Sequence, residues 1–182
     1  MGSNIILKLF GLKRKIRPVN RLDRDTSGIV VFAKNEYIQT SLVKQMAVKT
    51  FYKEYLAILD GFLTPEKGTI TAPIARKEGS IIQRCVREDG APSITHYEVL
   101  NTTDKFSIVK FVLETGRTHQ IRVHSAHMGS PILGDSLYGD YSELISRQAL
   151  HANKISFIHP ISKKKVEYIS TFPEDLNNFL HK

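Results

Sequence analysis

The sequence predicts an α+β fold with a mixed, largely antiparallel sheet and helices along its flanks. Segments rich in β-branched and aromatic residues recur along the chain, and several alternate between polar and apolar positions as half-buried strands do. Apolar residues at helical spacing occur in a few segments between them. Asp89-Gly90 is a strong signal for a two-residue hairpin turn, which joins antiparallel strands.

In the first half of the chain, residues 29–33 are expected to form a buried strand, because they are mostly β-branched and too few for an ordinary helix. Asn35 is expected to cap a helix. The apolar face of that helix should contain Ile38, Leu42, Val43 and Met46. Residues 51–59 read as a second strand, in which alternation places Lys53 and Tyr55 on one face.

Further strands are expected over residues 68–74, 81–86, 93–100, 106–113, 149–152, 155–159 and 165–170. A helix is predicted over residues 117–128, with Ile121, Ser125 and Met128 on one side, and residues 133–139 should be a loop. A terminal helix should begin at Pro173. Its apolar residues are Leu176, Phe179 and Leu180.

Charge and composition limit the possible partners. The 182 residues include 26 Lys and Arg against 18 Asp and Glu, a formal net charge of +8. Nucleic acid is the first candidate partner and an anionic membrane surface the second, with an unspecialised basic surface as the alternative. The single cysteine, Cys85, excludes an internal disulfide and a cysteine-rich metal site. The low cysteine count makes a reducing cytoplasm the expected compartment. Because no apolar run reaches the length of a membrane span, we expect a soluble protein.

The stretch before the first strand contains a candidate catalytic carboxylate. Asp23 precedes the turn formers at residues 25–27, whose side chains can bond to nearby backbone N–H groups. This arrangement would hold Asp23 just ahead of a rigid element. The alternative is that the aspartates of this stretch cap turns and pair with Arg21 and Arg24.

Separated motifs closely resemble the RluA-type pseudouridine synthases, in the same order along the chain. The motifs are Arg21-Leu22-Asp23 with Thr26-Ser27-Gly28, Lys53-x-Tyr55, residues 115–124, Gly134-Asp135 with Tyr138-Gly139, and residues 149–160. The likeness covers roughly residues 18–173, which makes a chance match improbable. Asn20 departs from the pattern, because this family commonly has histidine there.

The resemblance implies a pseudouridine synthase fold around a basic active-site cleft, and a reaction that isomerises uridine to pseudouridine in rRNA or tRNA without cofactor or metal. Asp23 matches the essential aspartate, which attacks the sugar or base or removes a sugar proton. Arg122 matches the arginine that pairs with that aspartate, and its guanidinium can hold a carboxylate by two hydrogen bonds. Tyr55 matches the tyrosine that lies against the flipped base and helps to remove its C5 proton.

RNA contacts are assigned to residues near these motifs: Arg21, Arg24, Arg117, His119 and Gln120. The last three are expected at the start of a helix, where backbone N–H groups favour phosphate. Asp135 is expected to cap or brace its loop. RNA is therefore the expected partner, with no membrane contact, and the protein is expected to be a monomer.

Two parts of the chain are distinguished. Residues 1–17 are interpreted as a basic N-terminal arm or a truncated first element, and residues 18–182 as the catalytic domain. Two other functions stay open: an RNA-binding module without catalytic activity, and a hydrolase that uses clustered histidines as metal ligands. The ligands in that second case would be His119, His124 and His127, with Asp23 or Asp135.

Overall fold

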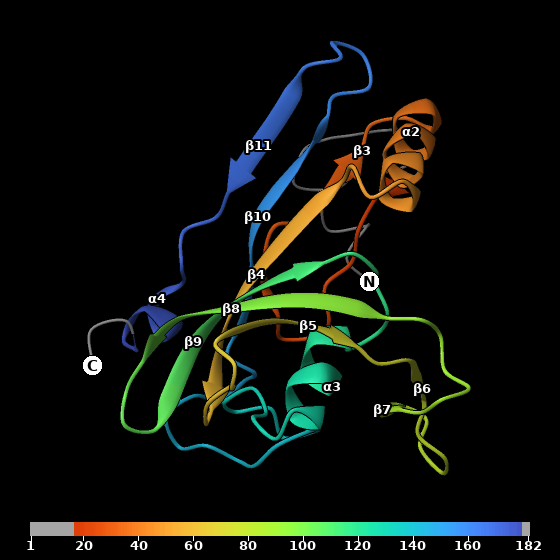
Figure 1. The fold of residues 1–182 in the computed structure, drawn as a ribbon. Helices are drawn as coiled ribbons and strands as arrows, with labels where there is room; N and C mark the ends of the chain where they lie inside the picture. The colour runs from red at the N-terminus through yellow and green to blue at the C-terminus, as the bar shows by residue number, and fades with distance from the viewer. Residues whose placement is uncertain (1–16, 180–182) are drawn as a thin grey trace.

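Within residues 17–179, which the computed structural model describes, a seven-stranded sheet forms the centre of the molecule (Figure 1). Its path is β11 (Lys165–Ile169), β10 (Leu150–Ile158), β4 (Tyr52–Asp60), β9 (Phe106–Leu113), β8 (Ile94–Thr102) and β5 (Lys67–Thr71), with β2 (Ser27–Gly28) beside β10. Every pairing is antiparallel except that of β2 with β10. The predicted α+β class with a mixed, largely antiparallel sheet is confirmed.

Smaller elements surround this sheet. The strands β1 (Arg17–Pro18) and β3 (Phe32–Ala33) pair with each other, as do β6 (Ile74–Arg76) and β7 (Arg84–Val86). The helices are α2 (Glu36–Ala47), α3 (Gln120–His127) and α4 (Glu174–Asn177). In Figure 1, α2 flanks one end of β4 and β10, whereas α3 lies below β5 and β8. None of the helices in residues 17–179 is long and apolar enough to cross a membrane.

The predicted boundary between the basic arm and the catalytic domain, at residues 17 and 18, lies at the start of the described residues. Residues 1–16, which hold most of the predicted basic arm, lie outside the described residues, as does Leu180. Arg17 belongs to β1 and pairs with Ala33.

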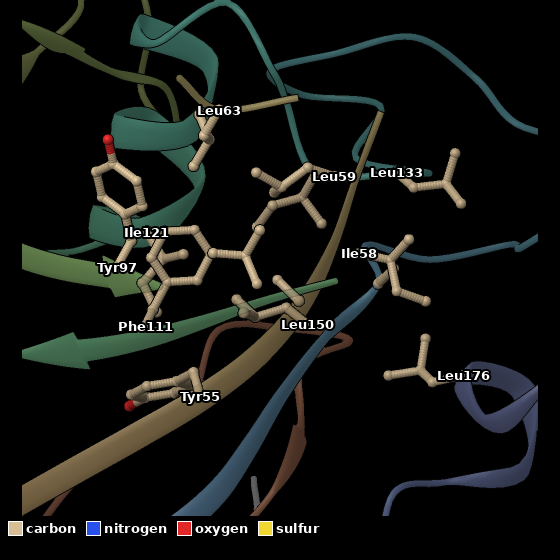
Figure 2. Close-up of a cluster of buried hydrophobic side chains, with 14 of the residues drawn as sticks. Tyr55, Ile58, Leu59, Leu63, Tyr97, Phe111, Ile121, Leu133, Leu150 and Leu176 are labelled. Carbon is tan, nitrogen blue, oxygen red and sulfur yellow. The ribbon is translucent and has the colours of Figure 1, made fainter. Parts of the chain in front are cut away.

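The strands predicted over residues 51–59 and 106–113 are present as β4 and β9, and both faces of each are covered near the centre of the sheet. Leu59 and Phe111 are fully buried, and Figure 2 shows their side chains packed with Ile121 of α3 and Leu150 of β10. Leu176 of α4 completes the cluster from the other side. Strands β4, β9 and β10 therefore form the packed centre of the sheet, and the Tyr55 side chain of β4 belongs to the same buried cluster.

Helix α2 begins where predicted. The Oδ1 atom of Asn35 accepts a hydrogen bond from the N–H of Ile38 at 2.9 Å, which satisfies one free donor of the first turn. The prediction that Val43 belongs to the core is wrong, because its side chain is 48% exposed. The helix packs along the edge formed by β1, β3 and β10, so only a narrow stripe around Leu42 is fully covered.

The predicted strand over residues 29–33 is wrong in extent. Only Ser27–Gly28 and Phe32–Ala33 are strands, and they belong to different sheets. The segment between them crosses from one sheet to the other. The side chain of Asn20 holds this crossing by bonding the C=O of Ile29 and the N–H of Val31, at 3.2 and 2.7 Å.

Two other predictions are corrected. Asp89-Gly90 lies in a turn, but β7 pairs with β6 rather than with β8. The third helix begins at Gln120 instead of residue 117, because His119 adopts the left-handed conformation at φ 60° and interrupts the helical path. Met128, predicted to be on the covered side, is 38% exposed.

We expect Gly28→Ala to lower the free energy of unfolding by more than about 2 kcal/mol. Gly28 has φ +114°, and an added Cβ would lie 2.3 Å from the carbonyl oxygen of Ala152 in β10. Gly129→Ala is the matched control, because Gly129 also has positive φ but its Cβ would meet nothing within 4 Å. The control should cost about 1 kcal/mol. Urea denaturation measures both, and equal losses would contradict the role of close strand approach.

Candidate active site

Asp23 lies in a turn that other parts of the chain hold in place. The turn is closed by the N–H of Thr26, which donates to the C=O of Asp23 at 3.1 Å. Asp25 takes a left-handed conformation within it, at φ 68°, and its carboxylate pairs with Arg24 on the exposed surface. Asp23 pairs with neither nearby arginine and lines a pocket instead. The alternative in which both aspartates serve only the turn therefore does not fit Asp23.

Three side chains, two just before β10 and one near its start, clamp this turn. Arg147 donates to the C=O of Asp25 at 3.2 Å, and Gln148 donates to the C=O of Arg24 at 2.5 Å. The His151 Nδ1 lies 2.9 Å from the Ser27 hydroxyl. Sequence reasoning gave none of these residues a role, although three polar side chains lie just before or within the first residues of a buried strand.

The clamp also extends to the end of the described chain. Arg147 forms two hydrogen bonds with the carboxylate of Asp175 in α4, at 2.7 and 3.0 Å. Paired, planar bonds of this kind fix a guanidinium in orientation as well as in distance. Helix α4 therefore supports the arginine that supports the Asp23 turn.

Tyr55 and Asp23 face the same pocket from different elements. Tyr55 is buried on β4, and both residues are part of the pocket wall. Burial raises the pKa of the Tyr55 phenol to about 12, with a further contribution from the negative charge of Asp23. The phenol therefore stays protonated at neutral pH and offers a ring face and an O–H donor.

The partner of Arg122 differs from the prediction. Its Nε and Nη2 atoms donate to the two carboxylate oxygens of Asp135, at 2.6 and 2.7 Å. Asp23 lies farther away, with Oδ2 3.9 Å from Nη1 of Arg122. The expected pair of hydrogen bonds is thus made with Asp135, and Asp23 receives a longer ion pair. The physical reason is burial: Asp135 is almost fully enclosed and could not be left without a cation.

Asp135 also braces its loop, as expected. Its Oδ1 atom accepts from the N–H of Leu137 at 3.1 Å, and its C=O accepts from Gly139 at 2.8 Å. The same loop brings Tyr138 over Arg122, whose guanidinium carbon lies 5.1 Å from the ring centroid. Such a cation over an aromatic face is attracted by the ring. Residues 133–139 therefore surround the arginine that faces Asp23.

His119 is joined to this group through Tyr138. Its Nδ1 lies 2.7 Å from the Tyr138 hydroxyl, and that hydroxyl accepts from the N–H of Arg84 in β7 at 2.9 Å. Burial lowers the pKa of His119, which favours the neutral ring at pH 7. Neutral His119 can accept a hydrogen bond from the Tyr138 hydroxyl. That hydroxyl then donates to His119 and accepts from Arg84.

The predicted RNA contacts fall into two groups. Arg21, Arg24 and Arg117 are exposed, and Arg21 and Arg117 line the pocket. Gln120 is only 2% exposed, and its amide bonds Arg117, Thr115, Ile94 and Thr95. The assignment of Gln120 to RNA contact is therefore corrected to a structural role, because its side chain is used in joining α3 to β8.

The pocket has a volume of about 570 Å³ and lies between the Asp23 turn, β4, the end of α2 and the segment before α3. Its polar and charged lining residues include Asn20, Arg21, Asp23, Lys49, Lys53, Tyr55, Glu114 and Arg117. Cations outnumber carboxylates in this set, which suits an anionic ligand.

The proposed histidine ligands for a metal do not converge. His124 is fully buried, and its two ring nitrogens lie 2.9 Å from the Thr95 hydroxyl and the Ala72 carbonyl. Across residues 17–179, no group of three or more His, Cys, Asp or Glu side chains is arranged to hold a metal ion. The geometry thus gives no support to the hydrolase alternative.

The fold is that of the pseudouridylate synthases. The solved structure of human RNA pseudouridylate synthase domain containing 1 superposes with a TM-score of 0.78 at 29% identity, over 94% of this chain and 74% of that one. Human RNA pseudouridylate synthase domain containing 4 gives a TM-score of 0.77 at 23% identity, over 98% of this chain and 80% of that one, which shows likeness of fold alone.

The sequence comparisons identify the family. The family model for RNA pseudouridylate synthase matches residues 3–127, and the chain belongs to that family. It is 46% identical over 166 residues to the RNA pseudouridine synthase YhcT of Bacillus subtilis, covering 90% of this chain and 55% of the relative. It is 40% identical over 176 residues to the ribosomal large subunit pseudouridine synthase D of Xanthomonas campestris, covering 89% and 53%.

These matches confirm the predicted resemblance to the RluA-type enzymes. The chain spans about half the length of these two bacterial relatives.

We expect Asp135→Asn to lower the free energy of unfolding by about 3 kcal/mol, because it leaves the buried Arg122 without its close counter-ion. Asp23→Asn is the matched change and should cost less than about 1 kcal/mol, since its ion pair is long and its side chain reaches solvent. Urea denaturation at pH 7 compares them. If Asp23→Asn were the more damaging change, Asp23 and not Asp135 would be the structural partner of Arg122.

We expect acid to loosen the clamp through His151. Burial lowers the pKa of His151 below its ordinary value of 6.5, so the unfolded chain takes up this proton first as the pH falls. The contribution of neutral His151 to the free energy of unfolding is therefore present above pH 6.5. It is lost as the pH falls from 6.5 to the lower pKa of the folded state. Urea denaturation between pH 7.5 and pH 5 should show this decline, and His151→Gln should reduce its slope. An unchanged slope in that variant would rule out His151 as a source.

Proposed function

We propose that this chain is the catalytic part of an enzyme that isomerises specific uridines of structured RNA to pseudouridine. The observation that carries the proposal is the meeting of Asp23, Tyr55 and Arg122 from three distant parts of the sequence. Asp23 and Tyr55 share a pocket wall, and Arg122 stands 3.9 Å from the Asp23 carboxylate. Membership in the RNA pseudouridylate synthase family supports this activity.

The reaction breaks the bond between N1 of uracil and C1′ of the ribose, turns the base and joins C5 to C1′. One proton leaves C5 and one is gained at N1, so atoms and charge balance without a cofactor. Asp23 is the essential carboxylate in this proposal, acting on the sugar or the base or removing a sugar proton. Arg122 places a fixed positive charge beside it, and Asp135 holds that charge in position.

Tyr55 supplies the surface on which the base rests. Its ring is buried in β4 at the edge of the apolar cluster, which fixes its plane. A flipped base gains stacking energy on such a ring. Because the raised pKa keeps the phenol protonated, we assign Tyr55 to stacking and hydrogen bonding and not to a phenolate base.

RNA reaches the pocket through its backbone charges. We assign phosphate contacts to Arg21, Arg24 and Arg117, whose guanidinium groups are exposed, and a nearby supporting contact to His119. Affinity should then fall steeply with salt, as for single-stranded targets in general. The Xanthomonas campestris relative is named for the large ribosomal subunit, which supports ribosomal RNA as the first substrate to test and transfer RNA as the second.

The decisive experiment maps pseudouridine in RNA from cells that lack the protein. Complementation uses the parent chain, Asp23→Asn and Asp25→Asn. Asp25 is the matched control, because it lies in the same turn but its carboxylate pairs with Arg24 at the surface. We expect the parent and Asp25→Asn to restore the missing site, and Asp23→Asn to reduce its occupancy at least about 100-fold.

Two results would contradict the proposal. Restoration by Asp23→Asn would show that the aspartate is not essential. If cells that lack the protein keep every pseudouridine and the purified chain binds RNA, the second candidate function is favoured, an RNA-binding module without catalytic activity.

A further inference from the structure

Lys53 is a cation in the pocket that has no side-chain partner among the described residues. It lies two residues before Tyr55 on β4 and lines the same pocket, and its side chain is partly buried. Within residues 17–179 it makes no side-chain hydrogen bond and no ion pair, and residues 1–16 contain no Asp or Glu that could supply one. Burial lowers the pKa of Lys53, as expected for an ammonium that lacks a counter-ion.

Among the described residues, neither carboxylate of the pocket pairs with Lys53. Glu114 bonds both Lys49 and His96, and the ion pair of Asp23 is the 3.9 Å contact with Arg122. Lys49 has Glu114 and Arg122 has Asp135 as a close counter-ion, whereas Lys53 has none in residues 17–179. A cation removed from bulk water and left unbalanced is costly unless an anion joins it.

Gly116 makes room for this ammonium. A Cβ built at Gly116 would lie 3.3 Å from the Nζ atom of Lys53, closer than most such contacts allow. Gly116 is not among the glycines with positive φ, so the backbone itself does not require glycine. The absence of a side chain at Gly116 leaves the ammonium of Lys53 uncovered on that side, where a ligand can enter beside the 115–118 segment.

We propose that Lys53, with the open surface at Gly116, forms a subsite for a phosphate of the RNA backbone next to the nucleotide in the pocket. The subsite rests on the proposed function and deepens it by placing a backbone anion on β4, beside the tyrosine that carries the base. A compact ammonium suits a phosphate, which it binds as a point charge. Arg117 and Thr118, which follow Gly116 in the chain, also line the pocket.

The test is a double-mutant cycle, measured by RNA affinity, that combines substitution of Lys53 with neutralisation of single phosphates of the RNA. All proteins carry Asp23→Asn, so that the RNA is not converted. The probe is a labelled stem-loop that spans the uridine located by the mapping experiment. It is used in its native form and in a set of variants, each of which has a neutral methylphosphonate at one of the phosphates flanking that uridine. The proteins are the parent, Lys53→Met, Lys53→Gln and the control Lys110→Met. Lys110 lies on the neighbouring strand β9 outside the pocket, and its ammonium pairs with Glu98.

We expect Lys53→Met to weaken binding of native RNA about tenfold and to lower the slope of log affinity against log salt by about 0.7. One methylphosphonate should weaken the parent to a similar extent but leave Lys53→Met unchanged, because the two changes remove the same contact. Lys110→Met removes the same formal charge and should change affinity less than about twofold.

The phosphate subsite would be overturned if each methylphosphonate lowered RNA affinity equally in the parent and in Lys53→Met. This is also the result expected if Lys53 binds a uracil carbonyl instead of a phosphate. If Lys53→Met fails to fold, Lys53→Gln decides by the same criterion. A parent that binds none of these RNAs would overturn the proposed function as well, which separates the two failures.

Discussion

The site depends on one buried guanidinium. Arg122 projects from α3 into a space where water cannot balance its charge, and Asp135 balances it through two short hydrogen bonds. Removing either partner would leave an uncompensated charge in the interior. Because Asp135 meets this requirement, Asp23 does not have to, and its carboxylate stays at the pocket wall. The carboxylate that balances the buried guanidinium and the carboxylate that lines the pocket thus belong to two different aspartates.

The surroundings of Arg122 explain why the loop over residues 133–139 is ordered by so many backbone bonds. Asp135 binds the N–H groups of its own loop, and Tyr138 covers the guanidinium while its hydroxyl bridges His119 and β7. The loop connects the arginine to the β6–β7 pair. The arginine that faces Asp23 is therefore supported by elements on both sides of it.

The parts of this molecule that were predictable from sequence are those governed by local patterns. Asn35 caps its helix through its own third neighbour, and alternation places Tyr55 and Lys53 in one pocket. The closest partner of Arg122 was not predictable, because no local pattern decides between Asp135, 13 residues away, and Asp23, near the start of the chain. Gln120 looked like a surface residue at a helix start. Its burial follows from contacts with β8, which no local pattern contains.

The strand expected over residues 29–33 failed for a similar reason. Its composition suits a strand, but Asn20 takes the N–H of Val31 and the C=O of Ile29, so the ladder bonds are replaced by side-chain bonds. The family motifs singled out Asp23 as a candidate, yet they did not reveal how its turn is held. That support comes from Arg147, Gln148 and His151, whose partners are defined only after the chain has folded.

The link from α4 to the Asp23 turn gives the C-terminal segment an importance that its distance in sequence conceals. Asp175 orients Arg147, and Arg147 holds the carbonyl of Asp25. Variation at positions 147 and 175 is therefore not independent, since a change at one removes the reason for the residue at the other. Over evolutionary time the two positions should drift together, and a graft of the catalytic strands into another scaffold would need to carry α4 with them.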